Sequence, residues 1–209
     1  MPLFSLKDVR FKEIIQYPYI EIPEGCATFI SGGSGCGKST LLKLLNGTVS
    51  ADSGEILYAG KHIEAYNPVT LRREVLLCGQ SVFLFDGSIQ ENFSEYYKYR
   101  DLSPLAQEDV HGYLKLCAAL FPLGADCAAM SGGERQRVFA AICLSLRPKA
   151  LLLDEPTSAL DDNTANTVMT NIKTFCRENN ITLIVVSHNK ALAETFADHV
   201  IALGGGQYE

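Results

Sequence analysis

Four short apolar runs constrain the fold of this chain more than any other feature of its sequence. They cover residues 26–31, 75–79, 150–154 and 181–187. Strands that are apolar along their whole length are typical of a parallel sheet buried on both faces, whereas half-exposed strands alternate apolar and polar residues. Segments with helical periodicity, such as 131–146, lie between these runs. The sequence therefore predicts an α/β fold in which helices cover both faces of a mostly parallel sheet.

The segments outside these runs predict two further parts of the fold. Two short strands before residue 25 and a third over 55–60, expected at a sheet edge, indicate a small antiparallel β region. Residues 81–130 are richer in aromatic and polar residues and carry short helical patterns, which indicates an inserted helical subdomain. A chain of 209 residues is long enough for one domain, whose core we expect over 1–80 and 131–209.

Composition and charge exclude several classes of function. The net charge of −6, without a concentrated basic stripe, argues against nucleic acid as the main partner. Seven scattered cysteines, with no C-x-x-C pair, predict reduced and mostly buried thiols in the cytoplasm rather than disulfides or a zinc site. The N-terminus lacks the apolar run of a signal peptide, and no apolar run approaches the ~20 residues needed to cross a bilayer. Any membrane role is therefore expected to depend on a partner.

Residues 32–39, GGSGCGKS, match the pattern G-x-x-x-x-G-K-[ST] directly after an apolar run and at the start of a helix. In such a loop, glycines let backbone N–H groups converge on phosphate oxygens, and the helix dipole favours the anion. Lys38 is expected to reach the β- and γ-phosphates, and the Ser39 hydroxyl to bind Mg²⁺. The pattern is too rare in a chain of this length for a merely flexible loop to be favoured. The predicted nucleotide-binding residues here are Gly32, Gly33, Ser34, Gly35, Cys36, Gly37, Lys38, Ser39 and Thr40.

Polar residues stand where the other three apolar runs end: Asp154 with Glu155, Gln80, and His188. Open α/β sheets bind ligands at the carboxyl ends of their strands. Asp154 suits Mg²⁺, and Glu155 is placed to polarise an attacking water. Taken singly, Gln80 is typical of a surface loop and His188 of a structural histidine. If the strands are parallel neighbours, however, their shared placement predicts that these residues and the P-loop converge on one γ-phosphate.

The stretch MSGGERQR, residues 130–137, opens a further predicted helix. Ser131 and Glu134 fit an S-x-x-E capping box, which by itself would indicate only a well-capped helix. That interpretation leaves Gly132 and Gly133 unexplained, because each glycine in a first helical turn costs about 1 kcal/mol relative to alanine. Glycines are useful where an anion must approach the backbone closely. The stretch is therefore a candidate second phosphate-binding element.

Taken together and in this order, five features of the chain resemble the motifs of the ATP-binding cassette (ABC) ATPases. GGSGCGKST resembles the Walker A motif, Gln80 the Q-loop, and MSGGERQR the signature motif. ALLLDEPTSALD resembles the Walker B motif with the D-loop, and SHN the switch-histidine motif. The resemblance covers nearly the whole chain. It implies a P-loop NTPase core of ABC ATPase type with an inserted helical subdomain, and ATP and Mg²⁺ as cofactors. It also implies that two cassettes sandwich two ATPs, each held between one subunit's P-loop and the other subunit's signature helix.

The resemblance assigns a role to each motif residue. Glu155 resembles the catalytic base and His188 the γ-phosphate contact, acting with Lys38. Gln80 would link Mg²⁺ and the attacking water to the helical subdomain. The implied metal ligands are Ser39, Gln80 and Asp154. The implied contacts to the ATP of the other subunit are Ser131, Gly132, Gly133 and Glu134. The implied dimer seam is Ser158, Ala159, Leu160 and Asp161.

The chain departs from the common family pattern in three places. The family usually has an adenine-stacking aromatic upstream of the P-loop where this chain has Glu13, so Phe11 or Tyr17 is the candidate substitute. The signature reads MSGGE rather than LSGGQ, and both changes keep residue size and helix-start chemistry. The stretch GQSVFLFDGSIQENF resembles exporter Q-loop regions, yet PLGADCAAM lacks the T-x-V-G-E-R-G pattern that exporters often carry. Import and export both stay open.

These features predict the ATP-binding and ATP-hydrolysing subunit of an ABC transporter. Mg-ATP would close a dimer with a second copy or a paralogous cassette, and phosphoryl transfer to water would reopen it. A separate transmembrane subunit, gripped through Gln80 and the helical subdomain, would hold the chain on the cytoplasmic face of the membrane. Two alternatives stay open: a soluble ABC ATPase that powers metal-cluster biogenesis or a cell-envelope complex, and a nucleotide-binding structural subunit that barely hydrolyses. The transported substrate is not indicated.

Overall fold

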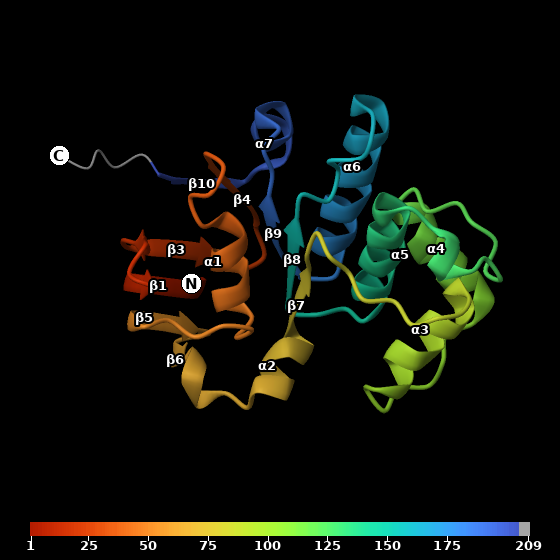
Figure 1. The fold of residues 1–209 in the computed structure, drawn as a ribbon, viewed down its shortest axis with the longest axis horizontal. Helices are drawn as coiled ribbons and strands as arrows, with labels where there is room; N and C mark the ends of the chain where they lie inside the picture. The colour runs from red at the N-terminus through yellow and green to blue at the C-terminus, as the bar shows by residue number, and fades with distance from the viewer. Residues whose placement is uncertain (205–209) are drawn as a thin grey trace.

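A computed structural model describes residues 1–204 of the chain. Its centre is a five-stranded sheet in the order β10-β4-β9-β8-β7, in which every pair of neighbours is parallel (Figure 1). Two of the three inner strands, β8 and β9, are buried along their whole length, as expected for apolar runs between helical layers. The predicted parallel sheet is therefore confirmed. The strand bounds are β4 Ala27–Gly32, β7 Val75–Cys78, β8 Ala150–Asp154, β9 Thr182–Val186 and β10 His199–Leu203.

A second, antiparallel sheet packs beside the first, and α1 (Lys38–Leu45) lies between the two (Figure 1). The apolar side of α1 contributes Leu41 and Leu45 to a core shared with both sheets. The strand over Ser53–Tyr58, β5, pairs with β1 on one side and with the two-residue β6 on the other. The expectation of an edge strand here was wrong because β6 covers that edge. The strands are β1 Pro2–Phe11, β2 Ile15–Tyr17, β3 Ile20–Pro23, β5 Ser53–Tyr58 and β6 Lys61–His62.

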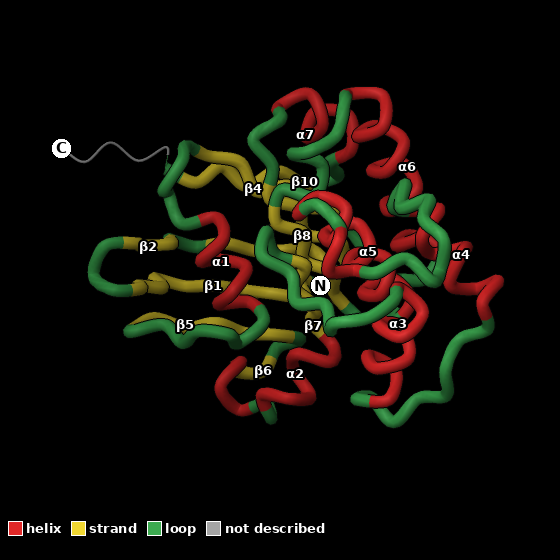
Figure 2. The backbone as a smooth tube through the Cα atoms, turned by 45° about the vertical axis from the view of Figure 1, so that its right-hand side comes forward, coloured by secondary structure: helices red, strands yellow, loops and turns green. Residues whose placement is uncertain are grey.

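The opposite face of the parallel sheet is covered by longer helices. A second core joins α5 and α6 to strands β8 and β9 and continues into α3 and α4, which lie at the end of the molecule away from the antiparallel sheet (Figure 2). The segment 81–130 thus forms helices, as predicted, and α4 packs directly against α5. The remaining elements are α2 Pro68–Glu74, α3 Ile89–Lys98, α4 Gln107–Leu116, α5 Gly132–Ser145, α6 Asp162–Glu178, α7 Lys190–Phe196, and the 3₁₀ turns Ile63–Ala65 and Cys127–Ala129.

The seven cysteines are unpaired, and five of them are buried, which agrees with the expectation of reduced thiols. No helix in the described part of the chain is both long enough and apolar enough to cross a membrane.

Candidate functional site

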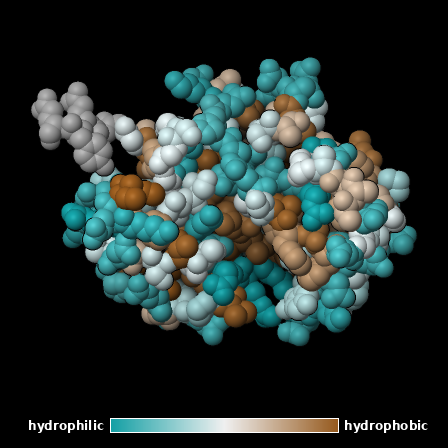
Figure 3. Space-filling model, in the orientation of Figure 1, coloured by the Kyte–Doolittle hydropathy of each residue, from teal (hydrophilic) through white to brown (hydrophobic). Residues whose placement is uncertain are grey.

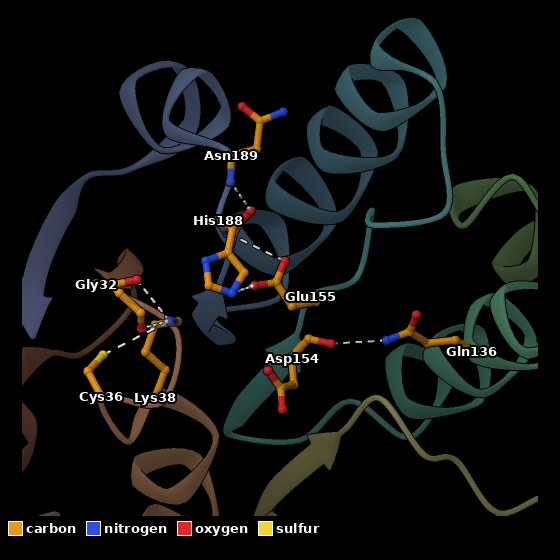
Figure 4. Close-up of polar contacts among 10 residues, drawn as sticks. Gly32, Cys36, Lys38, Gln136, Asp154, Glu155, His188 and Asn189 are labelled. Carbon is orange, nitrogen blue, oxygen red and sulfur yellow. Dashed lines mark hydrogen bonds and ion pairs between the residues drawn. The ribbon is translucent and has the colours of Figure 1, made fainter.

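The P-loop connects β4 to α1. Gly37, directly before α1, has a φ of 95°, and a Cβ at this position would lie 2.7 Å from the Tyr17 hydroxyl, so only glycine fits. The Lys38 side chain is 6% exposed, and its Nζ donates to the backbone oxygens of Gly32 and Gly33 at 2.9 and 2.8 Å (Figure 4). The loop therefore curls around a buried ammonium group at a helix N-terminus, an arrangement suited to binding phosphate groups.

Asp154 and Glu155 stand at the carboxyl end of β8 and are both buried. The Oδ1 atom of Asp154 has no hydrogen-bond partner among the described residues. Glu155 has a left-handed backbone, with a φ of 54°, and its N–H donates to the carbonyl of Val186 on β9 at 2.9 Å. A non-glycine residue in this conformation costs of order 1 kcal/mol, and β9 holds it in place.

His188 follows β9 and faces the Glu155 carboxyl group. Its Nε2 lies 3.3 Å from Oε1 of Glu155, and its backbone N–H donates to Oε2 at 3.4 Å. Burial raises the pKa of Glu155 above its ordinary value, although its contacts with His188 oppose that rise. The carboxyl group therefore holds a proton more tightly than an exposed glutamate does, which suits a group that accepts one from water.

Two cavities meet at Gln80, Glu155 and His188. The first, of about 240 Å³, is lined by the P-loop and α1, including Lys38, and by Asp154. The second, of about 620 Å³, opens on the other side of the same three residues. The predicted convergence of the strand ends is thus present in the structure, with Gln80 exposed at the junction of the two cavities.

The stretch MSGGERQR lies on the second cavity, away from the P-loop of its own chain. Ser131 and Glu134 form the predicted capping box: the Ser131 N–H donates to Oε2 of Glu134 at 2.8 Å, and the Glu134 N–H donates back to the Ser131 hydroxyl at 3.4 Å. The hydrogen bonds from Ser131 hold the pKa of Glu134 below its usual range. Gly132 and Gly133 both line the cavity, and a Cβ on Gly132 would meet no atom within 4 Å.

The expected adenine-stacking aromatic is only partly supported. Tyr17 is 1% exposed and donates its hydroxyl proton to the carbonyl of Gly37 at 2.7 Å, so it supports the P-loop from beneath and presents no face to a base. That candidate was wrong because packing against the P-loop buries the ring. Phe11 is half-buried against the core that α1 shares with both sheets, and it stays the aromatic candidate. An aliphatic residue that the sequence did not indicate, Ile15, lines the P-loop cavity.

Gln136 is a second residue that the sequence did not indicate. It lies on the second turn of α5, is 8% exposed and lines the larger cavity. Its Nε2 donates to the carbonyl of Asp154 at 3.0 Å (Figure 4). One signal was available: Gln136 is four residues before the apolar Ala140, which places the two on the same, buried face of a helix.

The residues at the P-loop cavity fit a hard divalent cation. Within residues 1–204, no three His, Cys, Asp or Glu side chains are grouped so that they could hold a metal by themselves. Ser39, Gln80 and Asp154 nevertheless line one cavity, and the buried Oδ1 atom of Asp154 lacks a partner. Hydroxyl, amide and carboxylate oxygens are the ligands that Mg²⁺ prefers, and it usually keeps phosphate and water among its ligands.

A P-loop and an acidic strand end, brought together at the carboxyl edge of a parallel sheet, define the class of P-loop nucleotide hydrolases. Comparison with known proteins then gives the family. The model of the family described as "ABC transporter" matches residues 18–158. The chain is 33% identical to "Probable iron export ATP-binding protein FetA" of Escherichia coli, over 97% of this chain and 91% of that protein. The chain therefore belongs to the ABC transporter family.

Two further likenesses bear on fold and function. The chain is 34% identical to "Methionine import ATP-binding protein MetN" of Rhizobium johnstonii over 85% of its length, but it spans only 51% of that protein. A bacterial Atm1-family ABC exporter with ATP bound has the same fold, with a TM-score of 0.85 at 27% identity over 97% of this chain and 37% of the exporter chain. The expected fold and family are confirmed, and the ATP-binding proteins of this family are ATP hydrolases.

Proposed function

We propose that this chain is the ATP-binding and ATP-hydrolysing subunit of an ABC transporter, in which nucleotide-driven closure of a dimer is coupled to transport through a separate membrane subunit. The observation that carries the proposal is the arrangement of the two cavities around Gln80, Glu155 and His188. One cavity holds the P-loop, and the other exposes Gly132 and Gly133, which the P-loop of the same chain does not meet.

ATP binding is assigned to the P-loop. The glycine-rich loop and the N-terminus of α1 supply backbone N–H groups and a favourable dipole for the phosphates. Lys38, whose ammonium group donates to two loop carbonyls, would transfer those hydrogen bonds to phosphate oxygens. Phe11 is the proposed adenine contact, and Ile15, which lines the cavity, would add apolar surface for the base.

Magnesium would be held by Ser39, Asp154 and Gln80, directly or through water. Its chemistry would be to neutralise charge on the phosphate groups. The partnerless Oδ1 atom of Asp154 supports this assignment, because a buried carboxylate oxygen without a partner costs free energy unless a ligand pairs with it.

Glu155 is the proposed general base and His188 the proposed γ-phosphate contact. The Glu155 carboxyl group is held 3.3 Å from the His188 ring, and burial raises its pKa, so it is better suited than an exposed glutamate to accept a proton from an attacking water. Of the His188 side chain, 56% is exposed, which leaves it accessible to a phosphate group above the P-loop.

A second copy of the chain, or a related cassette, would complete each ATP site. Gly132 is open to solvent on the side of the cavity, and the capping box fixes the direction in which the first N–H groups of α5 point. These groups would bind the γ-phosphate held by the other subunit's P-loop, with Ser131, Glu134 and the segment 158–161 at the seam. Because such a dimer binds ATP better than the open form does, ATP binding would drive closure.

The membrane partner would contact the surface between the core, 1–80 and 131–209, and the helical subdomain, 81–130. A cavity of about 230 Å³ between α2, α3 and α5 has apolar walls and three arginines, Arg72, Arg73 and Arg100. The surface is hollowed between α2 and α3 (Figure 3). This location would hold the chain on the cytoplasmic face of the membrane. The transporter names of the relatives favour transport over a non-transport assembly, and they include both import and export.

The experiment that tests the proposal is a dimer trap. Glu155→Gln should form an ATP-bound dimer with Mg-ATP, measured by light scattering, because binding is kept while hydrolysis is blocked. The double variant Glu155→Gln/Lys38→Ala is the matched control and should stay monomeric, since it lacks the phosphate-binding lysine. If Glu155→Gln binds ATP and stays monomeric at high protein concentration, the dimer mechanism is overturned. If Lys38→Ala binds ATP with unchanged affinity by calorimetry, the P-loop assignment falls.

A further inference from the structure

Gln136 is a buried polar residue on the second turn of α5. Its side-chain amide donates to the carbonyl of Asp154 at 3.0 Å and makes a longer contact of 3.4 Å with the carbonyl of Gly79. Asp154 is the last residue of β8 and precedes Glu155, while Gly79 follows β7 and precedes Gln80. One amide group therefore joins α5 to the ends of two neighbouring strands, each one residue before a proposed functional side chain.

This link is not needed to attach α5 to the sheet. Val138 and Ile142 on the same helix are fully buried in the apolar core, and the Cys78 thiol contacts the backbone carbonyl of Gln136. An apolar side chain of the same length would fill the space and would avoid the cost of burying an amide. What only an amide donor provides is a fixed distance between α5 and the two strand-end carbonyls, since a hydrogen bond has a narrow range of length and angle.

We propose that Gln136 is a positioning residue that couples the two phosphate-binding elements of one chain. When nucleotide at the P-loop shifts the ends of β7 and β8, the shared amide moves the N-terminus of α5, and with it Ser131 to Gly133. The ATP held by one subunit thereby sets how that subunit presents its signature stretch to the other ATP. This inference rests on the proposed function, because it assumes that Ser131 to Gly133 serve a second nucleotide.

The test compares two variants on the same helix. Gln136→Met keeps the length and approximate volume of the side chain and removes both donors. Val138→Ala, which opens a cavity at a fully buried apolar position of the same helix and leaves the Gln136 amide in place, is the control for a merely structural effect. For wild type and both variants, the affinity for Mg-ADP is measured by calorimetry and the melting temperature by circular dichroism.

The deciding readout is hydrogen exchange of backbone amides with and without Mg-ADP, at a concentration where the chain is monomeric. ADP occupies the P-loop and lacks the γ-phosphate that a second copy would contact. In the wild type, and in Val138→Ala despite its lower melting temperature, ADP should slow exchange both in the P-loop and at residues 131–134. In Gln136→Met, with ADP affinity within about twofold of wild type, exchange should slow in the P-loop alone. ATP turnover at saturation should fall about tenfold or more, as expected when groups around the reacting phosphate lose alignment.

The inference is overturned if Gln136→Met keeps the wild-type response at residues 131–134, or if the wild type shows no response there while binding ADP. Failure of the proposed function looks different: the wild type would not bind ADP at all, or the trapped dimer of Glu155→Gln would not form although exchange at residues 131–134 still responds to ADP.

Discussion

Two adjacent glycines in one helical turn offer a direct test of the site geometry. Gly132 and Gly133 both lie at the start of α5, and neither has a left-handed backbone, so alanine is conformationally allowed at both. A Cβ added to Gly132 meets no atom within 4 Å, whereas one added to Gly133 lies 2.8 Å from the Cβ of Ala159. The two substitutions are therefore chemically identical, and the one contact closer than normal that separates them is the contact with Ala159.

The difference in stability follows from that contact. Both variants gain up to about 1 kcal/mol of helix propensity, and this gain cancels in their comparison. Carbon atoms normally approach to about 3.5–4.0 Å, so Gly133→Ala must push away the turn that carries Ala159. Overpacking of this kind costs about 1–3 kcal/mol, so Gly133→Ala should melt about 2–12 °C below Gly132→Ala in a domain of this size.

Thermal unfolding by circular dichroism measures this difference, and Ala159→Gly supplies the matching control. The double variant Gly133→Ala/Ala159→Gly lacks the offending methyl group, so its loss of stability should be smaller than the sum of the two single losses. Equal melting temperatures for Gly132→Ala and Gly133→Ala would refute the packing of the signature turn against residue 159. Gly132→Ala, although stable, should weaken ATP-driven dimerisation in the Glu155→Gln background, because its methyl group lies where the other subunit's phosphate would approach.

Three further outcomes are expected. Glu155→Gln should raise the melting temperature at neutral pH, because burial raises the pKa of Glu155 and its ionisation therefore costs stability in the folded state. The difference in melting temperature from wild type should shrink as the pH falls through that raised pKa toward the value of about 4.3 in the unfolded chain. Ser131→Ala should cost about 1 kcal/mol in urea unfolding through loss of the helix cap, and an NMR titration should return the pKa of Glu134 toward its usual value; an unchanged titration would contradict the capping box. ATP should slow maleimide labelling of Cys36 in the P-loop and leave Cys26, at the opposite end of β4, unaffected; equal rates at Cys36 with and without ATP would refute its placement at the phosphates.

The parallel sheet could be predicted because its strands are apolar along their whole length, and the P-loop because its pattern is local. The polar residues that end those strands followed from the sheet type, since parallel strands bring their carboxyl ends to one edge. The order of the strands did not follow, because which apolar runs become neighbours depends on packing between distant segments. The two residues of β6 are too few to leave a pattern, so the neighbouring strand was mistaken for an edge.

The roles of two site residues could not be predicted from local sequence patterns. Tyr17 has the aromatic chemistry expected of an adenine contact, but contact with Gly37 turns its ring inward, which only the folded arrangement of β2 beneath the P-loop decides. In the sequence, Gln136 is an ordinary polar residue of a helix. Its proposed role rests on hydrogen bonds to two carbonyls that lie 18 and 57 residues away in the chain. Both cases concern contacts between segments far apart in the chain, whereas the motifs themselves concern contacts within one loop.

Glu155 is the residue at which the requirements of the fold and of the chemistry conflict most clearly. Its backbone is left-handed, its side chain is buried, and burial raises the pKa of its carboxyl group. Glycine or asparagine would relieve the backbone strain, and any uncharged side chain would remove the cost of ionisation. Each of these costs falls on stability and none is needed to end β8, and the contacts that the carboxyl group makes in return are both with His188. Backbone strain and the cost of a buried ionisable group therefore fall on the same residue, next to the P-loop cavity and His188. This combination is expected of a group kept for proton transfer.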